Sequence, residues 1–263
     1  MRVDVQDLRV LVPEDPECAD WVRDHLGGRL CVEVVPHPHS TQALQPDQER
    51  AARFGRAFLA AALADPFVPA LVLDPACEFV EGLPVDGWEV PDGADALLLG
   101  ANHLTYHPFT GAASGIAALR RPEAGLFRVL GTPSLHATAV LTRRFALFLY
   151  TACLRAVGEP GVPAEAWMAL SCPHFRVYAP RRLPCGLAPS CDPDRRALAD
   201  PERWAELGEV REPGLFERPV IRSPPLATNA RLSAMQATAS DTLAELLPLA
   251  SVRMPEAALV GLL

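Results

Sequence analysis

The chain has 263 residues, of which 49% are hydrophobic and 21% charged, a composition that excludes a mainly disordered chain. The formal net charge is -8 and all 24 basic residues are arginine, so neither a nucleic-acid surface nor lysine chemistry such as a Schiff base is indicated. With no signal peptide, no apolar stretch long enough to span a membrane and seven scattered cysteines typical of reduced thiols, we expect a soluble cytoplasmic protein.

Strand-like and helix-like segments alternate as far as Pro180. Short apolar runs predict strands at 8–13, 30–35, 69–73, 95–100, 127–130, 136–141 and 175–178. Helical spacing predicts helices at 21–25, from 46 to 62, from 142 to 158, from about 163 and from 231 to 249. The stretch from Pro180 to about Pro225 is rich in proline and charge and is expected to be mostly irregular. The order predicts an α/β fold with a mostly parallel, twisted sheet flanked by helices.

Common catalytic motifs are absent, because the chain has no glycine-rich dinucleotide turn, nucleophile elbow or His-Glu-x-x-His helix. A zinc-binding α/β protein is one alternative, in which Cys172, His174, Cys185 and Cys191 would supply the ligands, although free thiols near a proline-rich loop are the commoner outcome. Two histidine pairs in predicted loops are interpreted as solvated or capping residues in preference to a metal site: His37 and His39, and His103 and His107.

Four segments occur in an order typical of one enzyme family. They are 71–79 (LVLDPACEF), 95–100 (DALLLG), 136–144 (HATAVLTRR) and 177–180 (VYAP). Together they resemble the family 25 glycosyltransferases, the lipopolysaccharide and collagen-type enzymes with a GT-A (Rossmann-like) fold. The resemblance covers residues 46–192, and it implies a GT-A-like domain over 1–192 with an irregular or helical C-terminal extension, 193–263, packing on that domain.

The resemblance implies transfer of a sugar from a nucleotide sugar, with a UDP-sugar as the expected donor, to a glycan or protein acceptor. A divalent ion such as Mn²⁺ would neutralise the departing diphosphate, and carboxylates at a strand end could hold it. Asp74 is then the expected metal ligand, with Glu78 and His136 as further cofactor-binding candidates. Glu165 and Asp192 are the expected catalytic residues, as base or acceptor-binding groups.

Three of the residues that the resemblance covers also have a structural interpretation. Glu165 suits an exposed acid in the first turn of a helix, His136 suits a buried donor to a backbone carbonyl, and Asp95, which opens a predicted strand, suits a turn cap.

The acidic motif departs from the family pattern, because Pro75 and Ala76 stand where the family carries aspartates. Neither side chain contains an oxygen, so we expect Mn²⁺ binding at Asp74 to be weaker than roughly millimolar. Combined Pro75→Asp and Ala76→Asp substitutions should strengthen it. The departure keeps open an alternative function, that of a catalytically degenerate binding or scaffold protein with the same fold.

Overall fold

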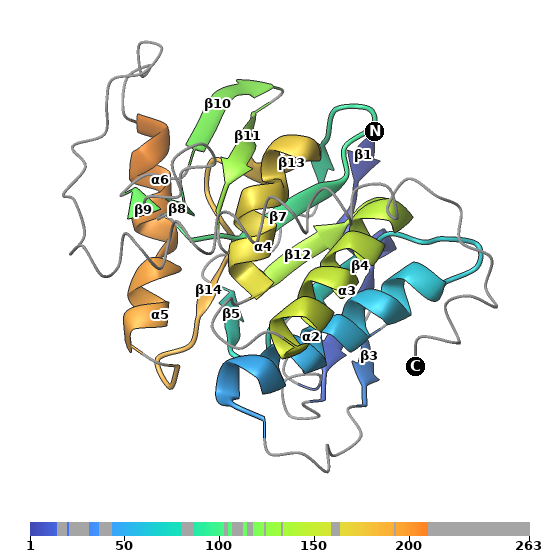
Figure 1. The fold of residues 1–263 in the computed structure, drawn as a ribbon. Helices are drawn as coiled ribbons and strands as arrows, with labels where there is room; N and C mark the ends of the chain where they lie inside the picture. Colours follow the sequence, from blue (N-terminus) through green and yellow to red (C-terminus); the bar gives the residue numbers. More distant parts are fainter. Residues whose placement is uncertain are drawn as a thin grey trace.

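A computed structural model describes residues 1–14, 20, 32–36, 44–79, 87–102, 105–106, 113–114, 118–123, 125–132, 134–158, 164–191 and 193–209. The fold of this part is centred on one large sheet (Figure 1). Its strands are β2 (Arg9–Pro13), β3 (Val32–Val35), β4 (Ala70–Leu73), β7 (Ala96–Gly100), β10 (Ala118–Glu123), β11 (Leu126–Gly131), β12 (Ala137–Val140) and β13 (Val177–Pro180). All the predicted strands are therefore confirmed, and β10 is an additional strand that the sequence analysis missed.

The spatial order of the sheet is β10, β11, β13, β7, β12, β4, β2 and β3. β3, β2 and β4 are parallel neighbours, and so are β7 and β13. β12 runs antiparallel between β4 and β7, and β11 runs antiparallel between β13 and β10. The expected α/β sheet is present and most of its strands share one direction, but the two reversed strands make it mixed.

Both faces of the sheet are buried in separate hydrophobic cores. Side chains of neighbouring strand residues point to opposite faces. Leu11 and Leu98 accordingly pack in one core, and Val10 and Leu99 in the other, all with 0% exposure. Full burial of one such side chain contributes about 1.5–3 kcal/mol, which explains why these strands are nearly continuous apolar runs.

Helices cover the face of the sheet on which Leu11 lies. The helices of the described part are α2 (Pro46–Leu63), α3 (Arg143–Gly158), α4 (Ala164–Ser171), α5 (Pro193–Leu198) and α6 (Pro201–Glu209). α2, α3 and α4 lie over the sheet (Figure 1), so the helices predicted from 46, 142 and about 163 are confirmed. The helices predicted at 21–25 and 231–249 lie outside the described residues.

α2 and α3 form an antiparallel pair. Gln48 Nε2, near the start of α2, donates to the Val157 carbonyl at the end of α3 at 2.7 Å, and Arg143 at the start of α3 donates to the Ala64 carbonyl beyond the end of α2. A Cβ on Gly55 would lie 3.1 Å from the Cβ of Cys153, so a small residue is needed where the helices meet. This close pair holds the start of α2 in place beside the carboxyl end of β4.

Two-stranded pairs complete the described part. They are β1 (Arg2–Val3) with β6 (Trp88–Glu89), β5 (Cys77–Phe79) with β14 (Cys185–Leu187), and β8 (Thr105–Tyr106) with β9 (Ala113–Ser114). Two short 3₁₀ turns, η1 (Val5–Asp7) and η2 (Cys172–His174), also occur.

The expected irregular stretch after Pro180 contains regular structure, namely β14, α5 and α6, so that prediction was wrong for these residues. Pro193 and Pro201 are the first residues of α5 and α6. Proline is tolerated there because the first helical N–H groups have no intrahelical acceptor. The sequence analysis took the prolines of this stretch as signs of irregular structure, and it therefore missed α5 and α6. The domain boundary proposed at 192 stays a prediction.

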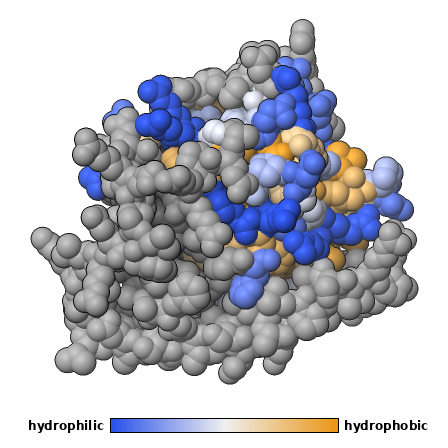
Figure 2. All heavy atoms as spheres, turned by 90° about the horizontal axis from the view of Figure 1, so that it is seen from above, coloured by the Kyte–Doolittle hydropathy of each residue, from blue (hydrophilic) through white to orange (hydrophobic). Residues whose placement is uncertain are grey.

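The described surface shows hydrophilic side chains interspersed with hydrophobic ones when the molecule is viewed from above (Figure 2). Among the described residues the large hydrophobic side chains that are exposed are Met1, Leu63 and Leu154. Within the same residues, none of the helices combines the length and the apolar character that a bilayer crossing requires.

Candidate functional site

Asp74 follows β4, an interior strand whose residues are all buried, and lies as predicted at the carboxyl end of that strand. Its backbone N–H donates to the His136 carbonyl at 2.7 Å, and its Oδ1 accepts the Ala76 N–H at 2.9 Å. The Cys77 N–H donates back to the Asp74 carbonyl at 2.9 Å, which closes a turn around Pro75. These bonds fix the carboxylate, whose side chain is 7% exposed, at the edge of the sheet.

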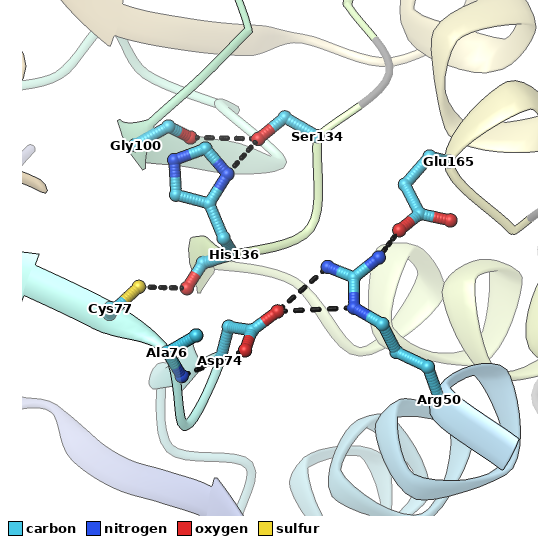
Figure 3. A network of polar contacts seen from close by, with 8 residues as sticks. All are labelled: Arg50, Asp74, Ala76, Cys77, Gly100, Ser134, His136 and Glu165. Atoms are coloured by element: carbon cyan, nitrogen blue, oxygen red, sulfur yellow. Dashed lines mark hydrogen bonds and ion pairs between the residues drawn. The ribbon is translucent and has the colours of Figure 1, made fainter. Parts of the chain in front are cut away.

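Arg50 joins Asp74 to Glu165 (Figure 3). From α2, its Nε and Nη2 donate to Asp74 Oδ2 at 3.1 and 2.8 Å. Its Nη1 forms an ion pair with Glu165 Oε1, which α4 contributes. The guanidinium also lies 5.0 Å from the ring centre of Phe54, one turn further along α2. One cation therefore bridges two carboxylates that come from different elements.

His136 lies beside this cluster, immediately before β12. Ser134 Oγ donates to the Gly100 carbonyl at 3.1 Å and lies 2.8 Å from His136 Nδ1, and the imidazole packs against Gly100. The Cys77 thiol donates to the His136 carbonyl at 2.6 Å. The imidazole ring of His136 is thus buried and has the Ser134 hydroxyl as a partner. The contacts of His136 with Asp74 and Cys77 are made by its backbone carbonyl.

Some of the candidate residues from the sequence lie together in the structure, and others do not. Asp74, His136 and Glu165 come together, although they belong to segments far apart in the chain. Glu78 lies on β5 with an exposed side chain, and no contact joins it to Asp74 among the described interactions. Asp192 lies outside the described residues. Glu165 is half-buried and ion-paired, so its interpretation as a merely exposed first-turn acid was wrong.

The oxygens of this cluster do not fit a divalent metal ion. Such an ion at a diphosphate takes oxygen ligands, normally from more than one carboxylate. Both Asp74 oxygens already accept N–H groups, and Glu165 contacts the same guanidinium. Across the described ranges, no three His, Cys, Asp or Glu side chains gather in a way that could hold a metal. Asp74, the expected Mn²⁺ ligand, thus forms an ion pair with Arg50 in this structure.

Arg50 is the residue that the sequence analysis missed. It lies four residues before Phe54 and eight before Phe58, on the apolar face of the predicted helix. An arginine on a buried helical face normally requires a carboxylate partner. That position was therefore a usable signal, although it could not identify Asp74 as the partner.

Asp95 has a structural role at the opposite end of β7. Its carboxylate accepts hydrogen bonds from Thr142 Oγ1, from Arg144 and from the Arg176 N–H, and its residue exposure is 1%. The side chain thus ties the start of β7 to the starts of α3 and β13. The structural interpretation of Asp95 is thus supported, but its partners belong to distant elements and not to a local turn.

The zinc alternative is not supported. Cys172 and Cys185 are fully buried in the two cores on opposite faces of the sheet, whereas His174 is exposed. Side chains so placed cannot share one ion with Cys191. The histidine pairs at 37 and 39 and at 103 and 107 lie outside the described residues.

No protein-family model matches the chain, and no curated protein is significantly similar to it.

Proposed function

We propose that the protein binds a nucleotide sugar, with a UDP-sugar as the expected donor, at the carboxyl end of β4 and transfers the sugar to a glycan or protein acceptor. The convergence of Asp74, His136 and Glu165 supports this most. The resemblance to family 25 glycosyltransferases selected these three residues from separate segments, and Arg50 and backbone hydrogen bonds join them into one network. Asp74 and His136 are neighbours because they flank the adjacent antiparallel strands β4 and β12, so the meeting of Asp74 with Glu165 through Arg50 is the more specific part of this support.

The location of the cluster also supports a ligand site. Open α/β sheets bind ligands in the crevice beyond the carboxyl ends of their strands. The Arg50 and Glu165 side chains are 23% and 19% exposed, so both remain accessible to a bound molecule.

The chemistry needs one bond exchange. The bond from the sugar to the diphosphate breaks, the acceptor oxygen bonds to the same carbon, and a base takes the acceptor proton. Glu165 is the base candidate in the described part of the chain, because its carboxylate is accessible. Arg50 orients that carboxylate, and Asp74 in turn holds Arg50.

The test is calorimetric titration with UDP, UDP-glucose and UDP-galactose, followed by measurement of UDP release in the presence of glycan acceptors. Asp74→Asn should weaken nucleotide binding by about tenfold, equivalent to roughly 1.4 kcal/mol. The buried Asp74 carboxylate accepts two N–H groups of Arg50 and fixes its position, and we expect the loss of this anchor to outweigh the removal of one negative charge. Asp92→Asn is the matched control, since the Asp92 side chain is 97% exposed and pairs with the N-terminal amino group instead of Arg50. Absence of binding to all three compounds, or equal binding by Asp74→Asn, contradicts the proposal.

A catalytically degenerate binding protein is the second candidate. The specific observation in its favour is the turn of Pro75 and Ala76, which offers no side-chain oxygen beside an Asp74 already paired with Arg50. Nucleotide-sugar binding without UDP release, over a panel of acceptors, would favour this candidate over transfer.

A further inference from the structure

Arg50 occupies the centre of the cluster, between Asp74 and Glu165 (Figure 3). A guanidinium has five N–H groups. Within the described part of the chain, the contacts with the two carboxylates use three of them, so two remain for a ligand. At 23% exposure the Arg50 side chain is accessible, and the Phe54 ring, 5.0 Å from its centre, supports its apolar stem and plane.

We propose that Arg50 takes the place of a divalent cation at this site, so that a nucleoside diphosphate binds without metal. This inference rests on the proposed function for its ligand. A guanidinium is always charged, and its planar fork matches phosphate oxygens. Unlike a metal ion recruited from solution, it is part of the chain and already lies between the two carboxylates.

The charges of the cluster set the expected strength of binding. A divalent ion between two carboxylates is neutral overall, whereas Arg50 with Asp74 and Glu165 carries one net negative charge. A bound diphosphate would therefore contact the N–H groups of Arg50 next to a net negative charge that slightly repels it. We expect weak binding that falls as salt is added, because the guanidinium contributes through accessible charges.

Glu165→Gln gives a test with a definite sign. The substitution removes one negative charge beside Arg50 and frees an N–H group, so UDP should bind several-fold more tightly. If Glu165 were instead a metal ligand for UDP binding, the same change would weaken it. Glu49→Gln is the control, because Glu49 is an exposed acid on α2 paired with Arg53. Weaker UDP binding by Glu165→Gln overturns the inference.

Removal of Arg50 should open the carboxylates to a metal. Electron paramagnetic resonance of Mn²⁺ reports the bound fraction directly. The unaltered protein and Arg53→Gln should leave Mn²⁺ free, whereas Arg50→Gln should bind it at least about tenfold more tightly, since two carboxylates and water can hold such an ion. Mn²⁺ binding by the unaltered protein, or no gain in folded Arg50→Gln, overturns the inference.

A measurement on the unaltered protein avoids any folding defect of Arg50→Gln. UDP affinity is measured with EDTA and then with excess Mn²⁺. Equal affinities support the inference. Binding that requires Mn²⁺ overturns it and leaves the proposed function standing. Absence of UDP binding in both conditions overturns the proposed function and the nucleotide part of this inference, while the Mn²⁺ resonance still decides whether Arg50 holds the cation position.

Discussion

The imidazole of His136 lies directly against the backbone of Gly100, the last residue of β7. A Cβ built on Gly100 would be 2.3 Å from His136 Nε2 and 2.4 Å from its Cδ2. Both distances are far below van der Waals contact. The glycine at this strand end is therefore required by the ring beside it, and the pair positions the backbone that contacts Asp74.

Gly100→Ala should lower the free energy of unfolding by about 1–3 kcal/mol, because the buried ring or β7 must shift. The measurement is urea unfolding. Gly158→Ala is the control, since nothing lies within 4 Å of a Cβ at that position. The double variant Gly100→Ala, His136→Ala should lose less stability than the sum of its single changes. A stability equal to that of the unaltered protein would refute the close contact.

Cysteine reactivity should follow burial. Cys153, Cys172 and Cys185 are buried free thiols, and Cys191 is a partly exposed one. Burial raises the pKa of Cys153 and of Cys172 to about 12 and raises that of Cys185 well above its usual range. Because the thiolate is the reactive form, a thiol reagent at pH 8 should label Cys191 much faster than these three.

Peptide mass spectrometry after timed labelling measures these rates, and Cys191→Ser is the control. Under denaturing, non-reducing conditions all seven cysteines should be titrated. Rapid native labelling of Cys172, or a count of five or fewer, contradicts the arrangement. Cys18 and Cys31 lie outside the described residues, and their unpaired state remains a prediction from the sequence.

Asp95 connects three elements, because its carboxylate contacts α3 through Arg144 and the start of β13 through the Arg176 N–H. Burial alone raises the pKa of Asp95, but the hydrogen bonds from Arg144, from the Arg176 N–H and from Thr142 outweigh it and lower the pKa below the usual 3.8. A carboxyl group whose pKa is lower in the folded state stabilises the fold above the unfolded pKa.

The stabilisation by Asp95 is therefore complete above about pH 4 and is lost as the pH falls through its folded-state pKa. Asp95→Asn should lower the free energy of unfolding at pH 7 by roughly 1.5–3 kcal/mol, and it should lose less stability than the unaltered protein between pH 4 and strongly acid conditions. Urea unfolding at pH 7, 5, 4 and 3 measures both effects. Asp92→Asn should behave like the unaltered protein, and an unchanged acid profile in Asp95→Asn would contradict the role.

The sequence predicted the start of one helix, α2, but not the starts of α5 and α6. Pro46 correctly marked the start of α2, because an amphipathic stripe with Phe54 and Phe58 follows it. Pro193 and Pro201 also begin helices, but α5 is too short to show a period, and α6 stands in a stretch rich in charge. A proline is informative only together with the pattern after it.

Trp204 attaches α6 to the rest of the molecule. Its indole is fully buried in the same core as α2 and α3, and its Nε1 donates to the Pro180 carbonyl at the end of β13 at 3.0 Å. In Figure 1, α5 and α6 lie at one side of the sheet, so this contact joins a peripheral helix to the central layer.

Trp204→Ala should lower the free energy of unfolding by about 3–5 kcal/mol, the usual cost of emptying a large aromatic site. Trp204→Phe should cost less, since it removes the hydrogen bond but keeps most of the apolar volume. Arg203→Ala is the neighbouring control, because that side chain is 61% exposed. Urea unfolding gives the three values, and equal stability of Trp204→Ala and the control would show that α6 packs independently of the core.

The amino-acid sequence by itself determined the α/β character, because each apolar run or amphipathic stripe records the burial of its own segment. It placed Asp74 at a strand end and marked His136 and Glu165 as candidates. Whether those candidates meet was not determined, since contacts between distant segments depend on strand order, and the reversal of β12 leaves no local signal.

Only the tertiary structure decided the state of the site. It brought Arg50 of α2 between Asp74 and Glu165, and it put Cys172 and Cys185 on opposite faces of the sheet. The charge of a side chain is known from the sequence, but the residue with which it pairs depends on how whole helices and strands pack. For that reason the absence of side-chain oxygens at Pro75 and Ala76 was visible from the sequence, whereas the cation that pairs with Asp74 was not.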